Sequence, residues 1–165
     1  MAVDTNAAER PRPTRPGSVV GIVVANFHEE LTGAMADSAE RELLLCGVEE
    51  DDIIVLHVPG AFELPIVARR LAASDEVDAV LCFGLVLRGE TEHDRWVAEG
   101  CVHGLMQASL ETDVPIHLGV LTCATMEQAR ARALSPELGG REDKGREVAR
   151  AAIETLLALD EIEEL

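Results

Sequence analysis

The feature that most constrains the fold of this chain is a regular alternation of short apolar runs with stretches of helical periodicity. Four runs have the length and aliphatic character of buried strands, namely residues 18–26, 53–58, 79–87 and 115–121. Apolar residues recur at helical spacing in the segments between and after them, namely residues 29–46, 62–73, 92–111, 126–134 and 144–159. Parallel strands require crossover connections of this kind, so the alternation predicts an α/β fold.

The predicted fold is doubly wound and flavodoxin-like, with a four-stranded parallel sheet, right-handed crossovers and helices on both faces. Its core must be aliphatic, because aromatic residues make up only 2% of the chain. A length of 165 residues favours one domain, which we assign to residues 18–165. Residues 1–17 are expected to form a flexible tail, since they combine polar residues with Pro11, Pro13, Pro16 and Gly17.

Charge and cysteine content argue against several classes of protein. A net charge of −17 disfavours binding to nucleic acid or to an anionic membrane surface. No apolar run approaches the roughly 18 residues of a membrane span, and the N-terminus shows no secretion signal, so we expect a cytoplasmic protein. The four cysteines lack CxxC spacing, which predicts buried free thiols rather than a zinc site or disulfides. We expect neither a metal nor a cofactor.

The loop after the third predicted strand carries candidates for chemistry, because ligands of doubly wound folds bind outside the carboxyl ends of the strands. Gly89 and Thr91 precede a helix there, and backbone N–H groups at a helix start can hold an anion such as a phosphate. Thr91 and Asp94 also have the spacing of a capping box, and this spacing alone favours an ordinary capped loop. His93 can exchange protons near neutral pH, although a single histidine at a loop edge is as often incidental.

The loops after the first two strands leave two alternatives open. Gly60 permits close approach of the backbone to a ligand, and Glu63 either accepts hydrogen bonds from hydroxyl groups or favours the helix N-terminus by its charge. Phe27 follows the first strand and is either a stacking platform for a ligand or a core residue.

Four segments together, in this order and spacing, resemble the lumazine synthase family: VPGAFELP at 58–65, GLVLRGETEH at 84–93, LGVLTCATMEQA at 118–129 and DKG at 143–145. The similarity extends over about residues 18–160. It implies a transferase of the penultimate step of riboflavin biosynthesis. Such an enzyme condenses 5-amino-6-(D-ribitylamino)uracil with 3,4-dihydroxy-2-butanone 4-phosphate, giving 6,7-dimethyl-8-ribityllumazine, phosphate and water, without redox chemistry.

The resemblance also implies roles for individual residues. His93 matches the general acid/base, and Phe27 matches the aromatic residue that stacks on the pyrimidine ring. The other residues matched to the uracil and its ribityl chain are His28, Ala61, Phe62, Glu63, Leu85, Val86, Leu87, Leu118 and Lys144. The residues matched to the phosphate are Gly89, Glu90 and Thr91, acting mostly through the backbone, and Arg132, acting as a clamp.

An interface site and a ring-shaped assembly follow from the same resemblance. Leu118, Arg132 and Lys144 match positions that reach the site from the neighbouring subunit, and Lys144 is the only lysine of the chain. The family forms pentamers with five interface sites, so we expect a homo-pentamer, with a decamer of two stacked pentamers as the alternative. Residues 134–143 form a longer link than in the capsid-forming members, which argues against a capsid.

Three positions depart from the family pattern. His28 replaces the usual Asn, Leu118 replaces the usual Phe, and Asp94-Arg95-Trp96 replaces an aromatic-acid-aromatic triplet. These changes leave a second hypothesis open, a catalytically weak paralogue that binds lumazines or flavins or has a structural role. The presence of His93, Arg132 and Lys144 favours the active enzyme.

Overall fold

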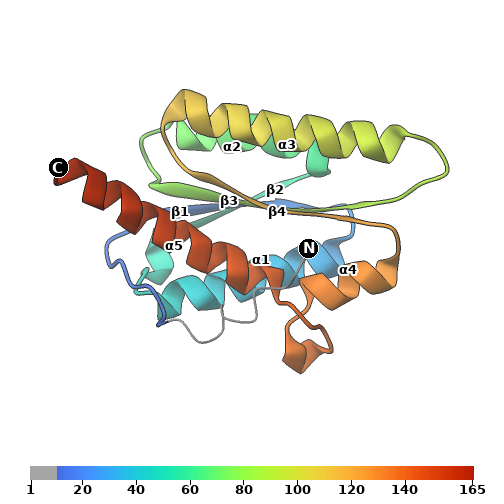
Figure 1. The fold of residues 1–165 in the computed structure, drawn as a ribbon, viewed down its shortest axis with the longest axis horizontal. Coiled ribbons are helices and arrows are strands. Elements are labelled where there is room, and N and C mark those ends of the chain that lie inside the picture. Colours follow the sequence, from blue (N-terminus) through green and yellow to red (C-terminus); the bar gives the residue numbers. More distant parts are fainter. Residues whose placement is uncertain (1–10) are drawn as a thin grey trace.

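A computed structural model describes residues 11–165 and confirms the predicted α/β fold (Figure 1). One parallel sheet is formed by β1 (Val20–Ala25), β2 (Ile53–Val58), β3 (Ala79–Leu87) and β4 (Ile116–Cys123), in the order β2-β1-β3-β4. The α-helices are α1 (Glu29–Leu45), α2 (Leu64–Ala72), α3 (His93–Thr112), α4 (Met126–Ala133) and α5 (Lys144–Glu163). The chain reverses its direction along the sheet between β2 and β3, as doubly wound topology requires.

Helices cover both faces of the sheet, with α1, α4 and α5 on one side and α2 and α3 on the other (Figure 1). Alternate residues of the strands therefore enter two different cores. Phe83 is fully buried on the α1 side and Cys82 on the α2 side. Aliphatic side chains supply nearly all the rest of both cores. Every residue of β1 is buried, which explains why the sequence of that strand is a continuous apolar run.

The structure corrects several predicted boundaries. β4 continues two residues beyond the predicted end at 121, and α5 continues to Glu163 rather than ending at 159. The second helix starts later than predicted, because Ala61–Glu63 first forms a 3₁₀ turn, although Pro65 does lie in the first turn of α2. The predicted loop 135–140 contains a further 3₁₀ turn at Pro136–Leu138.

The predicted N-terminal tail falls partly outside the described residues, which begin at residue 11. Two arginines of its remaining part contact the helices of the domain. Arg15 donates to both carboxylate oxygens of Asp160 at 2.7 and 2.8 Å, and Arg12 donates to the buried Glu42 at 2.8 Å. Glu42 also accepts from Arg150 at 2.7 Å. Burial by itself raises the pKa of the Glu42 carboxyl, but the hydrogen bonds and charges of Arg12 and Arg150 hold that pKa below its usual value.

All four cysteines are free and buried, as predicted. Burial raises the pKa of the Cys101 thiol to about 11, and Cys82, whose pKa burial also raises, packs in the same core. In the part of the chain that the structure describes, no helix has both the length and the apolar character needed to cross a membrane.

Candidate functional site

The carboxyl ends of the strands gather the predicted loops at one edge of the sheet. The loop after β1 is tied to the loop after β2, because Asn26 N donates to Val58 O at 2.8 Å and Phe27 N donates to Pro59 O at 3.1 Å. Farther along the same edge, Arg88 N in the loop after β3 donates to Cys123 O at 2.9 Å, which joins this loop to the end of β4. Backbone hydrogen bonds thus fix the relative positions of the predicted ligand-binding loops.

Phe27 is a surface residue, not a core residue, with 67% of its side chain exposed beyond the end of β1. This exposure favours the stacking-platform alternative. The ring of His28 meets it edge-on, with centroids 4.5 Å apart. His28 has a left-handed backbone, with φ of 63°, and its carbonyl accepts from Leu31 N and Thr32 N at the start of α1. Phe27 is therefore held on a sharp turn between β1 and α1.

The second loop carries Phe62 and Glu63 on a 3₁₀ turn, and the Phe62 ring lies over Gly100 of α3. Ala61 is buried and anchors the 3₁₀ turn, whereas Phe62 is exposed and Glu63 is half-buried. A Cβ atom on Gly60 would lie 3.2 Å from the Glu63 carboxylate, so glycine at this position allows Glu63 to fold back over the loop. The predicted close approach of the Gly60 backbone to a ligand stays a prediction.

The loop between β3 and α3 leaves its backbone open to solvent. Gly89, Glu90, Thr91 and His93 are all exposed. The predicted capping box is wrong, because no side chain caps α3 at Glu92, and Thr91 Oγ1 instead accepts from His93 N at 3.3 Å. Since the first N–H groups of a helix lack partners within the helix, this turn retains donors for an anion.

Leu118 lies apart from these loops on the edge strand of the sheet, whereas Arg132 lies on α4 and Lys144 at the start of α5. Leu118 is 47% exposed on the edge strand β4, where it pairs with Cys82, five positions before the strand ends at Cys123. At about 3.3 Å per residue, that places Leu118 roughly 16 Å from the carboxyl end. The sheet order also puts β3 and β1 between β4 and the loop after β2.

The side chains of Arg132 and Lys144 both contact groups of their own chain. Arg132 Nη1 donates to Gln128 O at 3.0 Å, and its Nε lies 4.0 Å from a Glu142 carboxylate oxygen. Lys144 Nζ donates to both carboxylate oxygens of Glu147 at 2.8 Å. Within a single subunit, Leu118 is thus separated from the strand-end loops, and Arg132 and Lys144 are paired with groups of α4, α5 and the link between them.

Sequence reasoning gave no role to Arg88 and Glu142. Arg88 lines a hollow together with Asp94 and Thr122, between the ends of β3 and β4 and the start of α3. The sequence signal that could have drawn attention to Arg88 is its place inside the segment GLVLRGETEH. Glu142 lies beside Arg132, and only the path of the chain between α4 and α5 reveals this. Among residues 11–165, no group of three or more His, Cys, Asp or Glu side chains is placed to hold a metal ion.

Comparison with known proteins identifies relatives along nearly the whole chain. A family described as 6,7-dimethyl-8-ribityllumazine synthase matches residues 17–160. The 6,7-dimethyl-8-ribityllumazine synthase of Salinibacter ruber is 41% identical over 151 residues, which cover 89% of this chain and 92% of that protein. The enzyme of the same name from Levilactobacillus brevis is 42% identical over 92% of this chain and 94% of its own length. The one from Gemmatimonas aurantiaca is 43% identical over 90% of this chain and 88% of its own length.

Proposed function

The chain belongs to the 6,7-dimethyl-8-ribityllumazine synthase family, and we propose that it carries out the reaction of that family in a site shared by two neighbouring subunits. The reaction condenses 5-amino-6-(D-ribitylamino)uracil with 3,4-dihydroxy-2-butanone 4-phosphate and is a step of riboflavin biosynthesis. The observation that carries the shared site is the separation of exposed Leu118, far down β4, from the strand-end loops of the same chain. We call these loops the strand-end half-site, and Leu118, Arg132 and Lys144 the outer half-site.

The strand-end half-site supplies binding and proton transfer. Phe27 stacks on the uracil ring, and His28 supports it at the edge of the pocket. The segment of Ala61, Phe62 and Glu63 and the backbone of Leu85, Val86 and Leu87 hold the ring and the ribityl chain. His93 moves protons during imine formation and phosphate elimination, for which an exposed imidazole at a helix start is suited.

The neighbouring subunit completes the pocket with its outer half-site. Its Arg132 binds the phosphate of the keto-phosphate opposite the backbone of Gly89, Glu90 and Thr91, because a guanidinium can donate two parallel hydrogen bonds to a phosphate. The ammonium group of its Lys144 attracts the ligand electrostatically, and its Leu118 forms an aliphatic wall of the pocket. Positioning of two reactive substrates supplies much of the rate acceleration.

A pentamer is the assembly that this arrangement supports, with a decamer as the alternative. A head-to-tail contact between two different surfaces closes into a ring when the rotation between subunits fits. Exposed apolar side chains on α2, α3 and the 3₁₀ turn before α2 offer a surface for such contacts: Phe62, Ile66, Trp96, Met106 and Leu110. We also propose a cytoplasmic location, in keeping with the free buried thiols, which persist in reducing compartments.

The shared site is tested by mixing two impaired variants. His93→Ala disables the strand-end half-site and Arg132→Ala disables the outer half-site. When subunits of the two variants are dissociated, mixed equally and reassembled, about a quarter of the interfaces regain both intact halves. Product formation from both substrates, followed by lumazine fluorescence, should recover to that extent.

The matched control mixes His93→Ala with Glu63→Ala, two changes in the same half-site. No interface of this mixture has an intact strand-end half, so activity should not rise above that of the unmixed variants. Equal recovery in both mixtures, or none in either, contradicts the shared site. A wild-type chain that forms no lumazine from the two substrates would instead favour the binding paralogue.

A further inference from the structure

We infer that Glu142 is a positioning residue for Arg132, which orients the guanidinium and weakens its hold on phosphate. This inference rests on the proposed role of Arg132 as the phosphate clamp. Glu142 lies outside the segments whose family roles are described above, and its place beside Arg132 comes from the structure of the link between α4 and α5.

The link holds the backbone of Glu142 against the end of α4. Ala131 O accepts from Arg141 N at 2.7 Å and from Glu142 N at 3.1 Å, so one carbonyl of α4 anchors two consecutive residues of the link. Gly140 N donates to Ser135 O at 2.9 Å and closes the preceding turn. A Cβ atom on Gly140 would collide with the carbonyl of Leu134, so this path of the chain requires glycine there.

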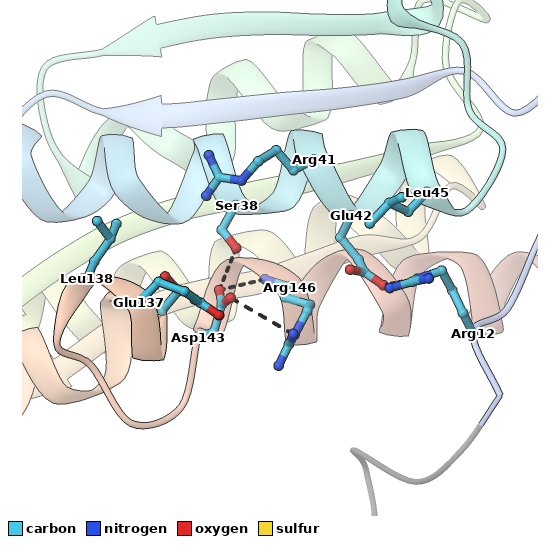
Figure 2. A pocket seen from close by; sticks show the side chains of 10 residues that line it. Arg12, Ser38, Arg41, Glu42, Leu45, Glu137, Leu138, Asp143 and Arg146 are labelled. Carbon is cyan, nitrogen blue, oxygen red and sulfur yellow. Dashed lines mark hydrogen bonds and ion pairs between the residues drawn. The ribbon is translucent and has the colours of Figure 1, made fainter.

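The residue after Glu142 is anchored as well, on the opposite side of the link. Asp143 is buried, accepts from Ser38 Oγ of α1 at 2.6 Å and caps α5 by accepting from Arg146 N at 3.2 Å (Figure 2). Figure 2 shows these contacts joining α1 to the start of α5. Because hydrogen bonds hold both Arg141 and Asp143, the backbone from which the Glu142 side chain extends is fixed in position.

Arg132 has two neighbours in its own chain. Gln128 O accepts from Nη1 at 3.0 Å, which restricts the rotation of the guanidinium plane. A Glu142 carboxylate oxygen lies 4.0 Å from Nε, within ion-pair distance but beyond a hydrogen bond. A guanidinium has five N–H donors, which leaves Nη2 to reach a phosphate. Arg132 and Glu142 also both act on buried Cys123, where burial is the main effect that raises the thiol pKa, the arginine lowers it and the carboxylate raises it. The pair therefore lies close to the carboxyl end of β4.

A carboxylate at this position has two opposing effects on phosphate binding. It orients the donor groups of Arg132 before the ligand arrives, which favours binding. It also lowers the positive potential at the guanidinium, which opposes a dianion. Because phosphate is released as a product after its elimination, a clamp of moderated strength suits turnover better than a tight one.

The experiment separates charge from shape with Glu142→Gln, which removes the charge and keeps the size. Inorganic phosphate is titrated calorimetrically into the assembled protein, and the KM for the keto-phosphate is measured alongside. We expect Glu142→Gln to lower the Kd for phosphate by about two- to five-fold, the range of a half-exposed ion pair, with a parallel fall in KM. Higher salt should reduce the difference, which a purely structural role would not predict.

The matched control is Glu137→Gln, the same charge change on an exposed residue of the same link, and its Kd should equal that of the wild type. In an Arg132→Gln background, Glu142→Gln should have no further effect. Unchanged or weaker phosphate binding by Glu142→Gln, while Arg132→Gln abolishes binding, would overturn this inference and leave the proposed function intact. If Arg132→Gln itself leaves phosphate binding unchanged, the phosphate clamp fails instead.

Discussion

At the scale of single residues, exposure distinguishes groups that the sequence treats alike. Phe27 and Phe83 both belong to or follow buried strands, yet Phe83 is fully buried and Phe27 is exposed beyond the strand end. His93 and His117 differ in a similar way. His93 faces solvent at the start of α3, whereas one ring nitrogen of His117 is buried and has no hydrogen-bond partner within residues 11–165. The two histidines should therefore respond to different measurements.

His93 is expected to govern turnover rather than binding. His93→Ala should lower kcat by about ten- to a thousand-fold and leave the affinity for the uracil substrate nearly unchanged. His93→Gln keeps a hydrogen-bonding side chain that cannot exchange a proton at neutral pH, so it should be impaired as strongly. Steady-state kinetics with both substrates measure these effects, and near-normal turnover in His93→Gln would exclude proton transfer by His93.

His117 is expected to destabilise the protein in acid. Burial lowers its pKa, and its Nε2 has no hydrogen-bond partner among the described residues, so the folded state favours the neutral ring. The resulting stability is complete above the unfolded pKa of about 6.5 and is lost as pH falls through the lower folded pKa. His117→Leu should remove this dependence. Urea unfolding at several pH values tests it, and parallel curves for both proteins would contradict it.

At the scale of elements, two glycines in helical and linking segments should behave oppositely. Gly140 has no room for a side chain, because a Cβ atom would meet the Leu134 carbonyl, whereas a Cβ atom on Gly33 in α1 would meet nothing within 4 Å. Gly140→Ala should lower the free energy of unfolding by about 1–3 kcal/mol. Gly33→Ala should raise it by about 0.5–1 kcal/mol, because alanine favours the helix.

Denaturant unfolding of the two alanine variants provides the comparison. Gly140→Ala should also tighten phosphate binding, as Glu142→Gln does, since displacement of the link moves the Glu142 carboxylate away from Arg132. A Gly140→Ala protein as stable as Gly33→Ala would show that the link adapts without strain.

At the scale of the whole molecule, an apolar surface on one helical layer should join subunits. Met106 and Leu110 of α3 are exposed, and a glutamate at Met106 would place a charge in that surface. Met106→Glu should lower the mass measured by light scattering and reduce activity in proportion, because a separated subunit has only half-sites. Leu159→Glu, an equivalent change on α5 in the other layer, should preserve both. An active Met106→Glu monomer would refute the shared site.

Sequence patterns predicted the strands and helices better than the turns at their ends. The strands and helices were predicted correctly, and the errors were local, as at the 3₁₀ turn of Ala61–Glu63 and the uncapped start of α3 at Glu92. Periodicity reports which face of an element is buried, whereas terminal turns depend on a few contacts that periodicity does not describe.

The sequence by itself determined the α/β class, the strands of the sheet, the aliphatic core and the loops that carry Phe27, Glu63 and His93, because each depends on patterns within one short segment. Only the tertiary structure decided which distant residues meet. The strand order separates β4, with Leu118, from the loop after β2, the folded link brings Glu142 to Arg132, and the approach of α1 to α5 joins Ser38 to Asp143. Such contacts depend on how crossovers arrange the elements in space, and no local pattern of side chains encodes that arrangement.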